Sequence, residues 1–125
     1  MNNEELIAAA RAVAAHAYAP FSKFRVGAVA VAGDGTRHVG VNVENSAYPA
    51  TTCAEAAAVA AAVAAGAETI EVVAVSCIDA TEPGYPCGNC RQIMHELGVR
   101  RVVIDGPDGP REHALEDLLP HGFRL

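Results

Sequence analysis

The sequence predicts an α/β domain, a three-layer α/β/α sandwich in which helices cover a mixed β-sheet, with residues 1–125 forming a single unit. Three observations support this fold class. Segments with apolar residues at helical spacing alternate with β-branched apolar runs. A Gly-Asp-Gly turn at 33–35 joins two extended segments into a hairpin. A chain of 125 residues is also long enough to bury one hydrophobic core without disulfide bonds.

The expected elements follow one another along the chain. They are a helix over residues 4–18, strands over 24–32 and 36–43, a helix over 53–65, a strand over 71–78, a helix over 87–97, a strand over 101–105 and a short helix over 114–119. The run at 71–78 is β-branched and apolar, which is typical of a buried central strand. The alanine-rich helix is apolar all round apart from Glu55, so we expect neighbouring subunits to cover part of it. Residues 106–109 are interpreted as a turn, followed by a tail that contains the last helix.

The charge of the chain favours a small neutral substrate over a polymer. A formal net charge of −6 and a pI near 5.2 argue against the basic surface that neutralises nucleic-acid phosphates. The longest apolar run, 56–67, is too short and too rich in alanine to span a bilayer. Four cysteines in a chain that starts without an apolar signal segment favour a reducing cytoplasm, where thiols stay free to bind a metal.

Two cysteine motifs, Cys53-Ala-Glu55 and Cys87-Gly-Asn-Cys90, carry the predicted chemistry. Three protein ligands and one open position are typical of a catalytic zinc, whereas a structural zinc has four. Cys87 and Cys90 share one face of a first helical turn. Cys53 and Glu55 would diverge on a regular helix, which places Cys53 at an N-cap. The sequence therefore predicts one Zn²⁺ per chain, held by three thiolates at two helix N-termini, with Glu55 as the catalytic residue that moves protons.

Two other classes of protein contain similar motifs. A thiol redox protein also has a Cys-x-x-Cys that follows a strand and opens a helix, but this interpretation leaves Cys53 and Glu55 without a role. A non-catalytic, zinc-stabilised binding module would need a fourth ligand. Cys77 lies on a predicted buried strand, where a free cysteine is usually a small apolar filler. A zinc-dependent hydrolase therefore explains more of the motif residues.

Further motifs resemble the small zinc-dependent cytidine deaminases that act on free nucleosides. The matching blocks are 18–28 (YAPFSKFRVGA), 40–45 (GVNVEN), 86–92 (PCGNCRQ) and 118–123 (LLPHGF). The resemblance implies hydrolytic deamination of cytidine or 2′-deoxycytidine to the uridine products with release of ammonia, a reaction of pyrimidine salvage. It also implies a sheet of five strands and a homotetramer. A deaminase of blasticidin S or another modified cytosine nucleoside is the alternative on the same scaffold.

The resemblance assigns substrate contacts to residues that otherwise have ordinary structural interpretations. Phe24 matches the aromatic residue that stacks on the base, although a phenylalanine on a strand is by default part of the core. Asn42 and Glu44 match the pair that hydrogen-bonds the ribose hydroxyls, and residues two apart on an extended segment project to the same side. Backbone groups near Ala54 match those that hold the base edge. Phe123 is the fifth residue expected to contact substrate.

Three features depart from the pattern of that family. Ala56 stands where many members have an arginine that hydrogen-bonds the zinc thiolates, Arg25 stands where proline is usual, and the Leu-Pro-x-x-Phe ending lacks a following proline. Without the arginine, other groups must offset the negative charge of three thiolates. The two helix N-termini are the main expected source, and Arg91 and Arg25 are further candidates.

Overall fold

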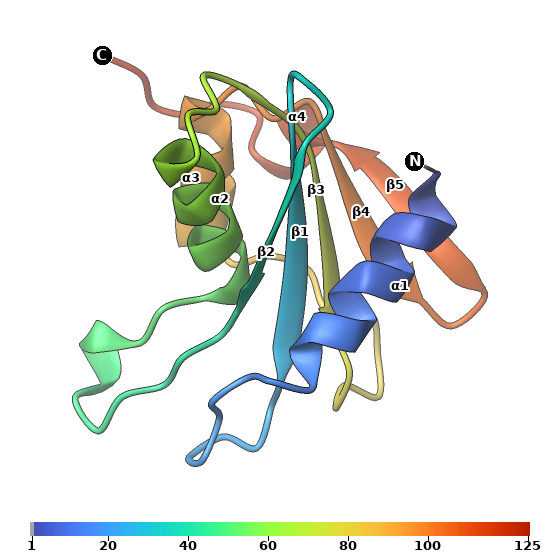
Figure 1. Ribbon diagram of the computed structural model, residues 1–125, viewed down its shortest axis with the longest axis vertical. Helices are drawn as coiled ribbons and strands as arrows, with labels where there is room; N and C mark the ends of the chain where they lie inside the picture. The colour runs from blue at the N-terminus through green and yellow to red at the C-terminus, as the bar shows by residue number, and fades with distance from the viewer. Residues whose placement is uncertain (1) are drawn as a thin grey trace.

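The computed structural model describes residues 2–125 and contains a five-stranded sheet with helices on both faces (Figure 1). In chain order the elements are α1 (Asn3–Ala14), β1 (Val26–Ala32), β2 (Arg37–Val41), the 3-10 helix η1 (Tyr48–Ala50), α2 (Ala54–Ala64), β3 (Ile70–Cys77), α3 (Gly88–Glu96), β4 (Arg101–Gly106), β5 (Gly109–Ala114) and α4 (Leu115–Leu118). The predicted three-layer arrangement around a mixed sheet is confirmed.

The sheet has the strand order β2-β1-β3-β4-β5. β1 pairs antiparallel with β2 and β3, β3 pairs parallel with β4, and β4 pairs antiparallel with β5. Because parallel neighbours need a crossover connection, the chain passes through α3 between β3 and β4. In the central strand β3 every residue except Glu71 and Cys77 is buried, which accounts for its apolar, β-branched sequence.

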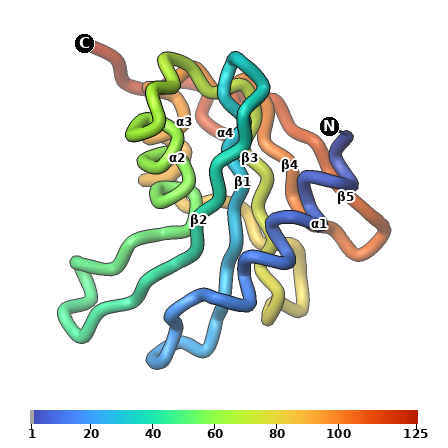
Figure 2. The backbone as a smooth tube through the Cα atoms, viewed as in Figure 1, coloured from blue at the N-terminus to red at the C-terminus, as the bar shows by residue number. Residues whose placement is uncertain are grey.

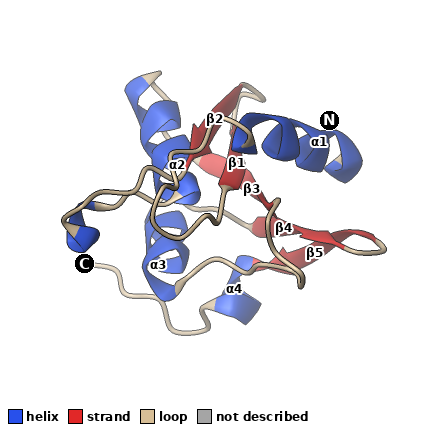
Figure 3. Cartoon of the chain, turned by 90° about the horizontal axis from the view of Figure 1, so that it is seen from below, coloured by secondary structure: helices blue, strands red, loops and turns tan. Residues whose placement is uncertain are grey.

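Side chains along each strand alternate between two faces, and each face has its own hydrophobic cluster. Figure 3 shows α1 on one side of the sheet and α2 and α3 on the other. The cluster under α1 comprises Leu6, Ile7, Ala10, Val29, Val72, Ala74 and Val103. The larger cluster includes Ala28, Ala30, Val73, Val75, Ala58, Met94 and Leu115, and it also contains Cys90. The cysteine motifs are therefore built into the layer that α2 and α3 form.

Two glycines let helices lie close to the hairpin strands. A Cβ atom at Gly27 of β1 would lie 2.0 Å from the carbonyl oxygen of Ala10 in α1. At Gly40 of β2 it would lie 2.3 Å from the backbone nitrogen of Ala58 and 2.5 Å from the carbonyl oxygen of Ala54, both in α2. Neither position admits a side chain unless a helix moves. Gly40 thus sets the distance between the sheet and the start of α2.

The first helix is shorter than the sequence pattern predicts. α1 ends at Ala14, whereas the expected helix continues to residue 18. The reason is a backbone pairing of Tyr18, whose N–H donates to the carbonyl of Asn42 (3.0 Å) and whose carbonyl accepts from the N–H of Glu44 (2.8 Å). Tertiary pairing thus overrides local helical spacing and draws this segment beside the residues that follow β2.

β5 occupies residues that the sequence pattern assigns to a turn and a tail. Its sequence, Gly-Pro-Arg-Glu-His-Ala, has no β-branched residue, and no position in it is fully buried. It lies at the edge of the sheet and pairs only with β4 among the described strands. An edge strand of this kind lacks the apolar alternation by which strands are identified.

One end of the sheet gathers segments that are far apart in the sequence. β1 begins there and β2 and β3 end there, since Val26 pairs with Cys77 and Gly27 pairs with Val41. α2 and α3 also begin at this end, and Figure 2 shows the loops at 15–25 and 42–53 extending beyond it. No helix within residues 2–125 combines the length and apolar character needed to cross a membrane. The motif residues therefore converge at one end of the sheet.

Candidate zinc centre and active site

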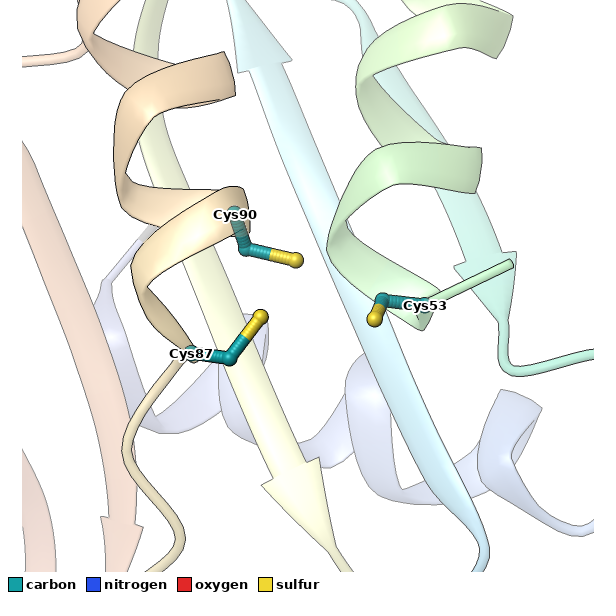
Figure 4. Close-up of side chains that lie close together, drawn as sticks. All are labelled: Cys53, Cys87 and Cys90. Atoms are coloured by element: carbon teal, nitrogen blue, oxygen red, sulfur yellow. The ribbon is translucent and has the colours of Figure 1, made fainter. Parts of the chain in front are cut away.

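The three motif cysteines meet at the N-termini of two helices. Cys53 is the N-cap of α2 and Cys87 is the N-cap of α3, both in extended backbone conformation, and Cys90 lies in the first turn of α3. The three sulfur atoms lie within 4.8 Å of one another, and Figure 4 shows them directed toward a common point. This cluster fits one tetrahedral zinc ion and leaves one ligand position for a non-protein group. The N-cap placement predicted for Cys53 is present.

Opposing effects act on the ionisation of these thiols. Burial raises the pKa of the Cys90 thiol, and the negative charge of Glu55 raises it further. Burial is also the main cause of the raised pKa of Cys53. In the opposite direction, the unpaired N–H groups and positive dipole ends of α2 and α3 favour thiolates at the cluster. A metal cation must displace the remaining thiol protons, so the affinity of this cluster for zinc falls as the pH is lowered.

Glu55 lies two residues after Cys53 in the first turn of α2, and only 6% of its surface is exposed. Burial raises the pKa of its carboxyl group. Its negative charge contributes to the raised pKa values of Cys53 and Cys90, so the carboxylate lies within electrostatic reach of the cluster. A buried carboxyl with a raised pKa beside a metal-type cluster has the properties of a general acid/base group.

Asn42 reaches from the segment after β2 to the segment before β1. Its Oδ1 accepts a hydrogen bond from the N–H of Val26 (2.9 Å), and its Nδ2 donates to the carbonyl of Phe24 (2.8 Å). Phe24 itself precedes β1, and 39% of its surface is exposed. Phe24 is therefore not a core residue, and Asn42 fixes the backbone on which it is carried.

Glu44 holds the same loop from a position two residues further on. Its carboxylate accepts hydrogen bonds from the backbone N–H groups of Phe21 (3.0 Å) and Ser22 (3.1 Å) and from the Ser22 hydroxyl. These bonds, with the Ser22 hydroxyl first, lower the pKa of Glu44. Asn42 and Glu44 thus project to the same side, as their spacing predicts, and Glu44 stays ionised at neutral pH.

A cavity of about 350 Å³ opens beside Glu44. Its lining residues are Phe21, Ser22, Glu44, Asn45, Tyr48 and Thr51. The rings of Phe21 and Tyr48 pack edge to face with their centroids 6.0 Å apart. Sequence reasoning did not select Ser22, Phe21 or Tyr48 as site residues. Phe21 and Ser22 lie inside the matched block 18–28, but nothing in a linear pattern indicates that they contact Glu44.

Comparison with known proteins decides between the protein classes that the motifs allow. The model of the cytidine and deoxycytidylate deaminase zinc-binding region matches residues 1–105. The chain belongs to this family. A cytidine deaminase from Mycobacterium tuberculosis is 44% identical over 113 residues, which are 90% of this chain and 82% of that protein. One from Sporosarcina psychrophila is 41% identical over 126 residues, which are 98% of this chain and 92% of that protein.

A solved structure agrees with the sequence relatives. The crystal structure of cytidine deaminase from Burkholderia pseudomallei superposes with a TM-score of 0.90 at 41% identity and covers 98% of this chain and 100% of that chain. The predicted family, its fold and its enzyme class, a zinc-dependent hydrolytic deaminase, are therefore confirmed. The blasticidin-type and thiol redox interpretations are not favoured, because these relatives are cytidine deaminases.

Phe123 lies on the C-terminal tail, beyond the residues that the family model matches. The side-chain amide of Gln92 in α3 donates to the carbonyl of Phe123 (2.8 Å) and accepts from its N–H (3.0 Å). Arg124 adds a hydrogen bond to the carbonyl of His95 (2.6 Å). These contacts fasten the tail along α3 while 67% of the surface of Phe123 stays exposed. Its contact with substrate stays a prediction.

The two arginines considered near the metal make other contacts. Arg25 forms an ion pair with Asp79 (2.8 Å), so its charge is matched by this carboxylate and the expectation that it offsets the thiolates is corrected. Arg91 donates to the carbonyls of Pro86 and Leu118, both at 2.8 Å, and so braces the residue just before Cys87. The helix N-termini are the compensating source that the geometry supports.

Cys77 ends β3 and stays outside the zinc cluster. It packs against the hydrophobic cluster under α2 and α3, and burial raises its pKa to about 11. Only Cys53, Cys87 and Cys90 form a metal-type group of histidine, cysteine or acidic side chains within residues 2–125. A neutral thiol in apolar surroundings is a small packing residue, as the sequence predicts for Cys77.

Proposed function

We propose that this chain, as a single domain over residues 1–125, catalyses the hydrolytic deamination of cytidine and 2′-deoxycytidine to uridine and 2′-deoxyuridine with release of ammonia. The observation that carries the proposal is the meeting of three thiols with the buried carboxyl of Glu55 at the start of two helices. The relatives from Mycobacterium tuberculosis, Sporosarcina psychrophila and Burkholderia pseudomallei are named cytidine deaminases, which supports the choice of substrate. This reaction would place the enzyme in pyrimidine salvage.

The residues of the cluster have distinct roles in this proposal. A zinc ion held by Cys53, Cys87 and Cys90 would supply a Lewis acid that makes water a nucleophile near neutral pH. Glu55 would take the proton from that water and return protons to N3 and to the departing amino group at C4 of the pyrimidine. Proton transfer of this kind contributes on the order of 10²- to 10⁴-fold in rate.

The nucleoside is proposed to bind at the same end of the sheet. Phe24 would stack on the base, backbone groups near Ala54 would hold its polar edge, and Phe123 would add an aromatic contact. Asn42 and Glu44 would hydrogen-bond the ribose hydroxyls, for which the ionised carboxylate of Glu44 offers charge-assisted acceptors. Glu44 also lines the cavity of about 350 Å³, a volume that suits a small ligand.

We further propose a homotetramer in the cytoplasm. One side of α2 is buried, but the opposite side exposes only apolar residues, namely Ala60, Ala61, Val63, Ala64 and Ala65. An exposed apolar helix face without charges is unfavourable in water and favours cover by another copy of the chain. Free thiols at the zinc cluster and at Cys77 are compatible with a reducing compartment.

Two assays on the purified chain test this proposal. Zinc is measured per chain by atomic absorption, and ammonia release is followed with cytidine, 2′-deoxycytidine, cytosine and blasticidin S. We expect about one zinc per chain and turnover of both nucleosides, with little activity on the free base, because cytosine offers nothing to Asn42 and Glu44. Turnover of blasticidin S alone would establish the alternative nucleoside, and zinc-bound protein inactive on the entire panel would contradict a deaminase.

A further inference from the structure

The ion pair between Arg25 and Asp79 joins two segments at the active-site end of the sheet. Arg25 Nε donates to Asp79 Oδ2 (2.9 Å) and Arg25 Nη2 donates to Oδ1 (2.8 Å). The backbone N–H of Arg25 also donates to Oδ2 (2.9 Å), and its carbonyl accepts from the N–H of Ile78 (3.1 Å). One carboxylate therefore fixes both the side chain and the main chain of Arg25, with a geometry that allows little rotation.

This pair links the segment that carries Phe24 to the loop that leads to Cys87. Arg25 directly follows Phe24, and Asp79 lies near the start of the loop that connects β3 with Cys87. Peptide groups on both sides of Phe24 are bonded to side chains, because its N–H donates to Ser22 Oγ (3.0 Å) and its carbonyl accepts from Asn42 Nδ2 (2.8 Å). The bond from the N–H of Arg25 to Asp79 is the third such restraint, and it reaches to the β3 side of the site, where the carbonyl of Arg25 also accepts from the N–H of Ile78.

A second ion pair of nearly the same geometry, between Arg11 and Asp105, serves as a control for the general effect that losing an ion pair has on stability. Arg11 of α1 donates from Nε (3.2 Å) and Nη2 (2.8 Å) to the two carboxylate oxygens of Asp105 in β4. The exposed fractions are also similar, 57% and 19% for Arg11 and Asp105 against 43% and 26% for Arg25 and Asp79. The Arg11 pair lies on the α1 side of the sheet. Within residues 2–125 the carboxylate of Asp105 also accepts from Ser76 Oγ (2.7 Å), and neither member of the pair bonds a proposed substrate residue.

We propose that Arg25 and Asp79 form a positioning pair for Phe24, and that they control how tightly the nucleoside binds rather than the rate of the chemical step. This inference rests on the proposed function and on the proposed contact between Phe24 and the base. The zinc ligands and Glu55 lie at the starts of α2 and α3, and among the described residues Arg25 bonds to Asp79 and Ile78 rather than to these helices. Loosening the backbone around Phe24 therefore weakens stacking on the base while proton transfer at Glu55 continues.

The first measurement is steady-state kinetics with cytidine for the parent, Arg25→Met, Arg25→Lys, Asp79→Asn and the control Arg11→Met. We expect KM to rise about three- to tenfold in Arg25→Met and Asp79→Asn and less in Arg25→Lys, with kcat within about twofold of the parent. The double variant Arg25→Asp with Asp79→Arg should recover part of the lost affinity. Arg11→Met should leave both constants unchanged although it loses an ion pair of the same kind.

A second measurement reports binding without turnover. Cytidine is titrated by calorimetry into Glu55→Gln and into Glu55→Gln combined with Arg25→Met, and Kd should rise by the same factor as KM. A KM equal to that of the parent in the Arg25 and Asp79 variants, or a fall in kcat at unchanged KM, overturns the positioning role while the deaminase function stands. A parent that forms no uridine refutes the proposed function first, and the positioning role with it.

Discussion

The carboxyl of Glu55 illustrates how the environment, more than the residue type, creates the candidate catalyst. A glutamate in the first turn of a helix is normally solvated and favours the ionised form through the helix dipole. Here burial raises its pKa, because only 6% of its surface is exposed and loss of solvation disfavours the ionised form. Alanine at position 56 leaves the thiolate charge to the helix N-termini, so the local chemistry depends on backbone donors.

At the residue scale, the proposed sugar contacts can be removed one at a time. Asn42→Ala and Glu44→Ala should each raise KM for cytidine while zinc content stays at that of the parent. Each substitution deletes proposed hydrogen bonds to the ribose worth about 1–3 kcal/mol. The larger loss is expected for Glu44, because its carboxylate makes charge-assisted hydrogen bonds. Kinetics with cytidine and metal analysis of the same preparations measure both quantities.

The matched control for this experiment is Asp34→Ala. Asp34 also makes side-chain to backbone hydrogen bonds in a turn, to the N–H of Thr36 (3.0 Å), but it lies in the hairpin turn at the opposite end of the sheet. We expect its KM for cytidine to match the parent. If Asn42→Ala and Glu44→Ala also match the parent, the sugar binds elsewhere.

The ion pair between Asp79 and Arg25 should make the stability of the fold depend on pH in the acid range. The hydrogen bonds and charge of Arg25 lower the pKa of Asp79 to about 2, from an unperturbed value of 3.8. A carboxyl with a lowered folded-state pKa adds stability that is present above pH 3.8 and is lost as the pH falls toward 2. Urea unfolding should therefore show a larger gap between the parent and Asp79→Asn at pH 6 than near pH 2. An equal gap at both values would contradict the lowered pKa.

The metal-binding residues could be predicted from the sequence. The residues that form hydrogen bonds between distant segments could not. Helical spacing placed Cys87 and Cys90 on one face, and the three-ligand requirement of a catalytic zinc linked them to the more distant Cys53, as the structure shows. The contacts of Ser22 with Glu44 and of Arg25 with Asp79 join segments separated by 22 and 54 residues, and no local pattern encodes such pairs. The exposure of Phe24 was not predictable from local pattern either, because the apolar run predicts a strand from residue 24, whereas β1 begins at Val26.

At the scale of elements, the site depends on how closely α2 approaches the sheet. The helix begins at the cluster, and its first two turns cross β2 at Gly40. A helix of alanines permits this approach, since its side chains fill little space. A shift of α2 by a few tenths of an ångström would change the distances between the sulfur atoms, because Cys53 lies at the start of α2 whereas Cys87 and Cys90 lie at the start of α3.

Gly40→Ala should therefore disturb both stability and metal binding. Its Cβ would lie 2.3 Å from the backbone nitrogen of Ala58, and overpacking of this kind typically costs about 1–3 kcal/mol. We expect a lower midpoint of urea unfolding and a reduced zinc content. Gly88→Ala is the control, because a Cβ there meets no atom within 4 Å. A Gly40→Ala protein as stable and as zinc-rich as the parent would show that α2 can shift freely.

The bounds of the buried helices and strands were predicted more closely than those of the exposed ones. β3 and α2 are buried and compositionally uniform, and their expected and observed bounds agree within one residue at each end. β5 lies at an edge and is half solvated, so its sequence carries no alternation. The end of α1 depends on pairing of Tyr18 with the segment after β2, a contact that forms only in the folded chain.

At the scale of the whole molecule, the exposed face of α2 makes a prediction about assembly. A charge placed at Ala61→Glu should weaken a homotetramer, because burying an unpaired carboxylate in an apolar contact is unfavourable. The control Ala8→Glu puts the same charge on the exposed side of α1. Light scattering should give a tetramer for the parent and for Ala8→Glu and smaller species for Ala61→Glu. A parent that is monomeric at micromolar concentration would contradict the proposed assembly.

The central claim is that a buried glutamate beside three zinc-binding thiols moves the protons of deamination, and Glu55→Gln tests it most directly. Glutamine keeps the size of the side chain but cannot accept and return a proton. We predict zinc content equal to the parent and uridine formation from cytidine reduced by roughly 10²-fold or more. Zinc-loaded Glu55→Gln that retains a tenth of parental turnover would contradict the account.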